Sequence, residues 1–224
     1  MESIISIKKE YEELEKSFEQ DLRTLNSIIL FSDEDLEGNC YYHWSNPGVG
    51  FISDWSFIYK RLNYYSLLKK RQSKKIIEIG FNAGHSALVF LNSMEKDSSL
   101  LIFDLCEHTY TESAFSFLKS KYPQVRDLIK GDSRTSIKKW ILDNREEIGT
   151  FDIIHIDGGH EKEIISYDIL HTDALLKPGG ILILDDTQLG EVNQFILSLI
   201  QMNYSFIYQI PTFGFSHCFL QKSF

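Results

Sequence analysis

Short apolar runs alternate with stretches of helical spacing along most of the chain after residue 74. The apolar runs lie at 75–79, 100–103, 127–130, 151–156 and 181–184, and the helical stretches lie at 85–95, 112–121, 134–147, 161–176 and 189–201. This alternation is typical of a parallel sheet with helices on both faces and right-handed crossovers. Two last runs, 204–209 and 215–220, flank a turn at 211–214 and predict an antiparallel pair at one edge. We therefore predict an α/β fold: a Rossmann-like, doubly wound, mostly parallel seven-stranded sheet with an antiparallel edge strand.

The N-terminal third of the chain has a different pattern. Residues 4–30 place apolar side chains three or four positions apart, with Glu, Lys and Gln between them, which predicts one amphipathic helix with a narrow apolar seam. The seam suits packing on the same domain, which we favour, or on a second copy in a homodimer. Residues 31–53 form an aromatic loop that is either a surface connection or a lid over a ligand site. A second helix begins near Asp54 and ends at the basic residues 69–71.

The stretch from Lys75 to Ser86 reads as a strand, a glycine turn and the start of a helix. The glycines let the backbone bend and approach a ligand, and such a turn suits a nucleotide-like molecule. Its candidate cofactor-binding residues are Glu78, Gly80, Phe81, Asn82, Gly84 and Ser86. A dinucleotide fingerprint would need glycine where Asn82 and His85 stand, so a nicotinamide-dependent oxidoreductase is disfavoured and remains an alternative.

Acidic residues follow the later strands as well. Because parallel strands point the same way, whatever follows each strand lies along one edge of the sheet, where ligands bind. Asp104 follows the second strand, where an acid can accept hydrogen bonds from ribose hydroxyls. Asp132 and Ser133 follow the third strand and are candidates for contact with adenine, although Asp132 can equally cap the next helix.

The last strand ends carry an acid, a histidine and a pair of acids. Asp157 and His160 flank two glycines after the fourth strand, and Asp185 and Asp186 follow the fifth. Three carboxylates gathered there would repel one another unless a cation lay among them. Oxygen ligands without cysteine favour Mg²⁺ or a similar divalent ion over zinc. His155, inside the strand, is better explained as a core histidine than as a ligand.

Composition indicates which classes of partner and which cellular location to expect. The chain has 224 residues, 43% of them hydrophobic, so it can bury a substantial core. A formal net charge of -9 disfavours a nucleic-acid backbone as partner. The three cysteines lie far apart without C-x-x-C pairing, which argues against a disulfide framework and a zinc knuckle. No apolar run reaches membrane-spanning length, and residues 1–10 do not resemble a signal peptide. We expect a cytoplasmic protein that acts on small molecules, with no nucleic-acid or membrane partner.

Five of these stretches together resemble the class I S-adenosylmethionine (SAM) dependent methyltransferases. They are residues 78–86, Asp104, residues 131–133, residues 156–160 and residues 177–186. Within that class they are similar to the metal-dependent O-methyltransferases, which include catechol O-methyltransferase and the macrocin-type enzymes that methylate sugar hydroxyls. The resemblance covers roughly residues 75–187. We expect an N-terminal helical or lid extension, residues 1–74, and a methyltransferase domain, residues 75–224, within one globular unit.

The resemblance implies that SAM is the cofactor and gives several residues a role toward it. Gly80 and Gly84 would line its methionine portion, and Ser86 would meet the methionine carboxylate. Asp104 would hold the ribose, and Ser133 would lie near the adenine.

The resemblance also implies the chemistry. Asp157, Asp185 and Asp186 match the metal-ligand positions, and His160 stands at the general base, which is lysine in catechol enzymes and histidine in the macrocin type. We therefore expect methyl transfer to a hydroxyl of a small molecule, most simply a sugar, with Asp157 and His160 in the catalytic centre. A metal-independent methyltransferase and a non-catalytic SAM-binding subunit remain alternatives.

Overall fold

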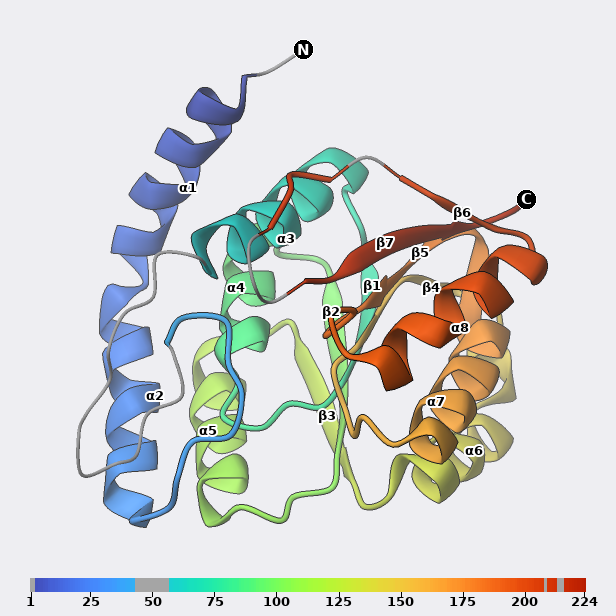
Figure 1. Ribbon diagram of the computed structural model, residues 1–224. Coiled ribbons are helices and arrows are strands. Elements are labelled where there is room, and N and C mark those ends of the chain that lie inside the picture. The colour runs from blue at the N-terminus through green and yellow to red at the C-terminus, as the bar shows by residue number, and fades with distance from the viewer. Residues whose placement is uncertain (1–2, 43–56, 208, 213–215) are drawn as a thin grey trace.

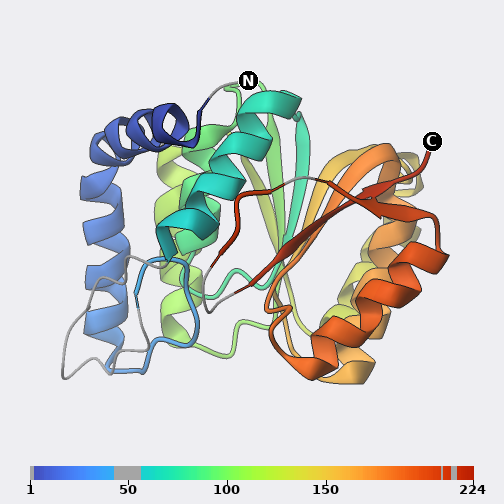
Figure 2. The same ribbon diagram turned by 45° about the horizontal axis from the view of Figure 1, so that its top comes forward.

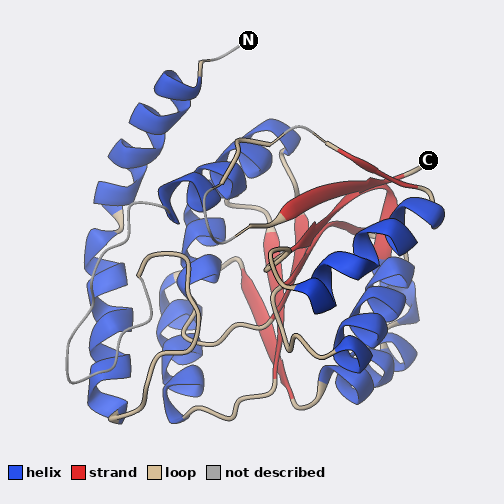
Figure 3. Ribbon diagram, viewed as in Figure 1, coloured by secondary structure: helices blue, strands red, loops and turns tan. Residues whose placement is uncertain are grey.

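Seven strands form one sheet that lies between two layers of helices (Figure 1, Figure 3). The computed structural model describes residues 3–42, 57–207, 209–212 and 216–224. The strands are β1 (Lys75–Ile79), β2 (Ser99–Asp104), β3 (Val125–Lys130), β4 (Phe151–Ile156), β5 (Leu176–Leu184), β6 (Tyr204–Phe206) and β7 (Cys218–Lys222). Their order across the sheet is β3-β2-β1-β4-β5-β7-β6.

The strand directions follow the sequence pattern. Strands β1 to β5 pair in parallel, and β7 pairs antiparallel with both β5 and β6. The predicted Rossmann-like sheet with an antiparallel edge is thereby confirmed. The β6 strand is shorter than predicted and β7 begins later, while part of the predicted turn at 211–214 lies outside the described residues.

The helices divide between the two faces of the sheet (Figure 2). They are α1 (Ile4–Ser17), α2 (Glu19–Ser32), α3 (Phe57–Arg71), α4 (His85–Ser93), α5 (Thr109–Lys121), α6 (Ser133–Asp143), α7 (Lys162–Leu175) and α8 (Gly190–Gln201). Helices α3, α4 and α5 cover one face, and α6, α7 and α8 cover the other. None of these helices combines the length and the apolarity needed to cross a membrane.

Alternating side chains of the central strands fill two separate cores. In β1, Ile76 packs into the core under α3 and α4, whereas Ile77 and Ile79 pack into the core on the opposite face. A strand buried on both faces needs a nearly continuous apolar sequence, which explains why the β1 run contains so few polar residues. Its single acid, Glu78, is fully buried.

The N-terminal segment contains two helices, and the prediction of one helix over residues 4–30 is wrong. The break lies at Phe18, whose φ of -117° and ψ of 15° leave the helical region. The Phe18 side chain is buried, and its carbonyl accepts hydrogen bonds from the amides of Asp21 and Leu22. The bend lets α1 pack on α3 while α2 packs on α5, so the apolar seam is covered by helices of the same chain.

The largest difference from a predicted boundary among the later helices is at the end of α6. The helix predicted over 134–147 ends at Asp143, because Asn144 takes up φ -133° and ψ 53°. Residues 145–147 continue as a short 3-10 turn. Asp54, the predicted start of α3, lies outside the described residues.

Candidate active site

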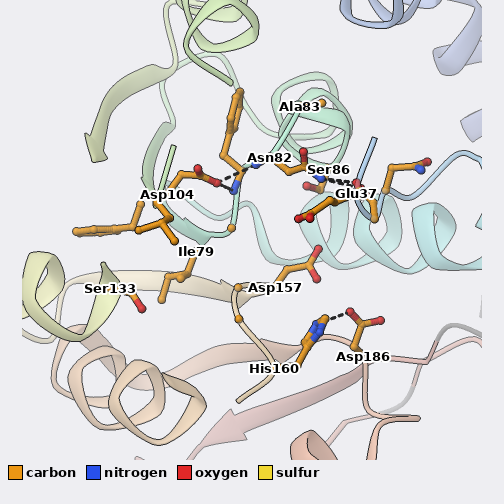
Figure 4. Close-up of a pocket in the computed structure, with 18 of the residues that line it drawn as sticks. Glu37, Ile79, Asn82, Ala83, Ser86, Asp104, Ser133, Asp157, His160 and Asp186 are labelled. Atoms are coloured by element: carbon orange, nitrogen blue, oxygen red, sulfur yellow. Dashed lines mark hydrogen bonds and ion pairs between the residues drawn. The ribbon is translucent and has the colours of Figure 1, made fainter. Parts of the chain in front are cut away.

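A pocket of about 660 Å³ opens at the carboxyl ends of the parallel strands. Most of the predicted site residues line it: Gly80, Phe81, Asn82, Ser86, Asp104, Asp132, Ser133, Asp157, His160 and Asp186. Figure 4 shows how those it labels point from the glycine turn, from Asp104 and from the ends of β4 and β5 toward one space. Three predicted residues, Glu78, Gly84 and Asp185, are not among the lining residues.

The turn after β1 requires glycine at its first position. Gly80 has a φ of 88°, in the left-handed region. A Cβ there would lie 2.5 Å from the carbonyl carbon of Asp157 and 2.9 Å from the amide nitrogen of Gly158. The backbone at the end of β1 therefore lies directly against the backbone that follows β4, and this contact joins the cofactor turn to the Asp157 segment.

The Asp104 carboxylate holds the glycine turn in shape. Its Oδ2 accepts hydrogen bonds from the amides of Phe81 (2.7 Å) and Asn82 (2.9 Å), and its Oδ1 accepts one from the amide of Cys106 (2.6 Å). Phe81 and Asn82 head the turn, so their amides have no partner within a helix or strand. Asp104 thus supplies the acceptors that keep the turn open toward the pocket (Figure 4).

Glu78 and Ser86 bind each other. The Ser86 hydroxyl donates to Glu78 Oε1 at 2.5 Å. Ser86 lines the pocket, whereas Glu78 is fully buried behind it. The pair connects the end of β1 to the first turn of α4, so a ligand that takes the Ser86 hydroxyl must compete with Glu78.

Asp132 caps α6, the alternative that the sequence left open. Its Oδ1 accepts from the amide of Arg134 at 2.9 Å, and its carboxylate pairs with the Arg134 guanidinium at 2.6 Å. The hydrogen bond from Arg134 lowers the pKa of Asp132. Ser133, the first residue of the helix, lines the pocket beside the ends of β2 and β3.

The segment after β4 brings an acid and a histidine to the pocket. Burial and the neighbouring charge of Asp185 raise the pKa of Asp157 above its ordinary value. His160 Nε2 lies 2.8 Å from Asp186 Oδ2 (Figure 4). The hydrogen bond to Asp186 raises the pKa of His160 above its ordinary value. The imidazole is therefore oriented by a carboxylate from the next strand.

Asp185 is buried and bound by side chains of the same chain. Its Oδ2 lies 2.7 Å from Lys60 Nζ and 3.3 Å from His155 Nε2, and it accepts a hydrogen bond from the Tyr64 hydroxyl at 2.8 Å. Its Oδ1 accepts from the amide of Asp186 at 2.8 Å. Burial opposes ionisation of Asp185, but the positive charge of Lys60 prevails and holds the pKa of Asp185 well below its usual range.

Lys60 and Tyr64 are residues of the site that sequence reasoning missed. His155 was expected to be a core histidine, and it is fully buried. Burial lowers its pKa, but the neighbouring Asp185 and Glu78 outweigh that effect and raise the pKa to about 10. Lys60 and Tyr64 stand four positions apart on α3 and so share a helix face. That spacing was the only sequence signal for them, and it does not reveal which acid they meet.

The three carboxylates predicted to bind a metal do not form one group. Among the described residues, the donor groups suited to a metal are His155 with Asp157 and Asp185, and Asp157 with His160 and Asp186. Asp185 and Asp186 therefore face different neighbours. Mg²⁺ requires a nearly octahedral set of oxygen ligands at short distance, and the predicted set does not provide one because both oxygens of Asp185 are already bonded within the protein.

The N-terminal extension reaches the rim of the pocket. Asn82 Nδ2 donates to the carbonyls of Glu37 and Gly38, and His108 lies between the carboxylates of Glu34 (3.0 Å) and Glu37 (3.2 Å). Residues 34–38 are thus fastened over the glycine turn and the start of α5. Residues 43–53 of the predicted lid lie outside the described residues.

Comparison with known proteins identifies a family and curated relatives that the chain resembles. Residues 77–187 match the family described as methyltransferase domain. The chain is 27% identical over 121 residues to a flavonoid 3',5'-methyltransferase of Vitis vinifera, covering 54% of this chain and 50% of that protein. It spans about half the length of the curated relatives it matches.

Two solved structures share the fold at low sequence identity. The O-methyltransferase TomG of Streptomyces achromogenes, in complex with SAM, is 21% identical, with a TM-score of 0.60 over 91% of this chain and 89% of that chain. The O-methyltransferase of Bacillus cereus, in complex with S-adenosylhomocysteine (SAH), is 16% identical, with a TM-score of 0.56 over 70% of this chain and 77% of that chain.

Proposed function

Because residues 77–187 belong to the methyltransferase domain family, we propose that this chain is a SAM-dependent O-methyltransferase that methylates a hydroxyl of a small molecule, with a sugar as the acceptor. One observation supports the proposal above all others. The glycine turn after β1, the Asp104 carboxylate after β2 and the Asp157–His160 segment after β4 line one pocket. SAM bound in this pocket would supply the activated methyl group.

In this proposal residues at the ends of β1, β2 and β3 would hold the cofactor. Ser133 would contact its adenine, Asp104 its ribose, and the turn from Gly80 to Ser86 its methionine portion. A carboxylate has about four acceptor positions, and three backbone amides already occupy Asp104. Asp104 would therefore have room to accept a hydrogen bond from one ribose hydroxyl.

His160 is the general base of the proposed reaction. Its Nε2 is held by Asp186, which places the ring proton on Nε2 and directs Nδ1 to the acceptor hydroxyl. Methyl transfer from a sulfonium needs the acceptor oxygen in line behind the methyl group, and such alignment lowers the barrier substantially. His160 takes the hydroxyl proton as the oxygen attacks, and Asp157 lines the same wall and orients the hydroxyl.

The expected acceptor follows from the remaining pocket lining. Glu37 and Tyr42 add polar side chains to the lining, and a molecule rich in hydroxyls offers partners for both. No step of this mechanism is routed through a metal, because Asp185, one of the three predicted Mg²⁺ ligands, is already bonded to Lys60, Tyr64 and the amide of Asp186.

Calorimetric titration tests the cofactor and product analysis tests the reaction. We expect the protein to bind SAM and SAH in one-to-one stoichiometry and not to bind NAD. Radiolabelled methyl should then pass from SAM to a sugar within a panel of sugars, polyols and phenols. Binding of NAD in place of SAM would overturn the proposal in favour of an oxidoreductase. Tight SAM binding with no transfer to any acceptor would favour a non-catalytic subunit.

Replacing Asp104 with asparagine should weaken SAH binding by about 10- to 100-fold, because the variant loses a charged acceptor that shapes the turn and meets the ribose. Calorimetry on the purified variant measures the change. D127N is the matched control, since Asp127 is an exposed acid on β3, and it should bind SAH as the wild type does. Equal affinity in D104N and the wild type would remove Asp104 from the cofactor site.

A further inference from the structure

The site contains a buried positive charge that the mechanism above does not use. Lys60 lies on α3, lines the pocket and is buried. Its Nζ lies 2.7 Å from Asp185 Oδ2. A buried ammonium is stable only when it is paired, so Lys60 and Asp185 form one unit at the inner wall of the pocket.

The contacts of Asp185 show that this unit is complete. Oδ2 has three partners, Lys60, Tyr64 and His155, and Oδ1 accepts the amide of Asp186. These contacts use the acceptor positions of a carboxylate. A divalent ion bound to Asp185 would have to displace the ammonium and leave it buried without a partner, which is strongly unfavourable.

The Lys60 ammonium also reduces the repulsion between the carboxylates, which was the reason for the metal prediction. Three acids near one another need a neutralising charge. In this structure the Lys60 ammonium pairs with Asp185, and Asp186 is bonded to His160, which leaves Asp157 as the acid that faces the acceptor. Lys60 thus supplies a positive charge where a divalent ion was expected.

We propose that Lys60 is the built-in cation of this site, that it occupies the position a divalent ion would take at Asp185, and that methyl transfer proceeds without a bound metal. Lys60 is a positioning residue, since it acts through Asp185 and so fixes the adjacent Asp186 and its histidine. This inference rests on the proposed methyl transfer, but its decisive readout is metal binding, which needs no knowledge of the acceptor.

The test measures Mn²⁺ binding to the full chain saturated with SAH. Calorimetry and the electron paramagnetic resonance signal of free Mn²⁺ both detect the binding. We expect no stoichiometric uptake by the wild type or by K60R, which keeps the positive charge. We expect K60M, which keeps the length of the side chain, to bind one Mn²⁺ at least about tenfold more tightly than the wild type. Without the ammonium, the carboxylates of Asp157 and Asp185 have no lysine to neutralise them and can bind the ion. The double variant K60M/D185N should lose this gain.

Each result decides the inference. Stoichiometric Mn²⁺ uptake by the wild type, or methyl transfer that EDTA abolishes and Mg²⁺ restores, overturns it, and this measurement does not depend on the folding of any variant. A wild type and a folded K60M that both lack uptake would overturn the claim that Lys60 takes the place of the ion. Failure of the wild type to bind SAH would instead refute the proposed function, so the two failures are distinguishable.

Discussion

The Gly80→Ala substitution is expected to lower the free energy of unfolding by about 3–5 kcal/mol, through backbone strain together with overpacking. The strain arises because a φ of 88° is unfavourable for alanine. The overpacking arises because the new Cβ would lie within 2.5 Å of the Asp157 carbonyl carbon. Urea unfolding of both proteins, followed by circular dichroism, measures the difference.

The control for this substitution is Gly149→Ala. Gly149 also has a positive φ, 66°, but a Cβ there meets nothing within 4 Å. Gly149→Ala should lower the free energy of unfolding by about 1 kcal/mol, from backbone strain alone. Equal decreases in the free energy of unfolding for the two variants would show that the end of β1 does not lie against the segment after β4. The proposal that the cofactor turn and the Asp157 segment meet in one site would then be wrong.

Replacing His160 with alanine should lower turnover by about 100-fold or more, as the loss of a general base does. SAH affinity should stay near the wild-type value, because His160 faces the acceptor and not the proposed cofactor region. The measurement is steady-state methyl transfer to the sugar that the acceptor panel identifies, together with calorimetric titration of SAH.

Two comparisons make the His160 result specific. His171, a half-buried histidine on α7 outside the pocket lining, should tolerate alanine without loss of turnover. Added imidazole should restore part of the activity of H160A, since it can supply the missing base. Turnover of H160A equal to that of the wild type would remove His160 from the mechanism.

Much of the fold could be predicted because its signals are local. A strand buried on both faces needs a continuous apolar run, and the runs that became β1 and β4 show this in the sequence alone. The resemblance to class I methyltransferases rests on the residues that end these strands, and the family match over residues 77–187 confirms it. Parallel strands place their ends together, which is why most of the predicted site residues line one pocket.

The features that could not be predicted depend on contacts between distant parts of the chain. Tyr64 and Asp185 are 121 positions apart, and nothing local to α3 indicates that its buried lysine meets this acid. The bend at Phe18 has the same cause: the apolar spacing continues through residue 18, but α1 and α2 pack on different helices. The metal prediction counted the acids at the strand ends and left out the cation that the N-terminal extension brings to them.

The central claim is that one pocket holds the cofactor along β1, β2 and β3 and presents its methyl group to Asp157 and His160. A crystal structure of the protein with SAH tests it most directly. We predict the adenine beside Ser133, a ribose hydroxyl hydrogen-bonded to Asp104 and the sulfur directed at the Asp157–His160 segment. SAH bound elsewhere, or bound here with its sulfur directed away from Asp157 and His160, would contradict the account.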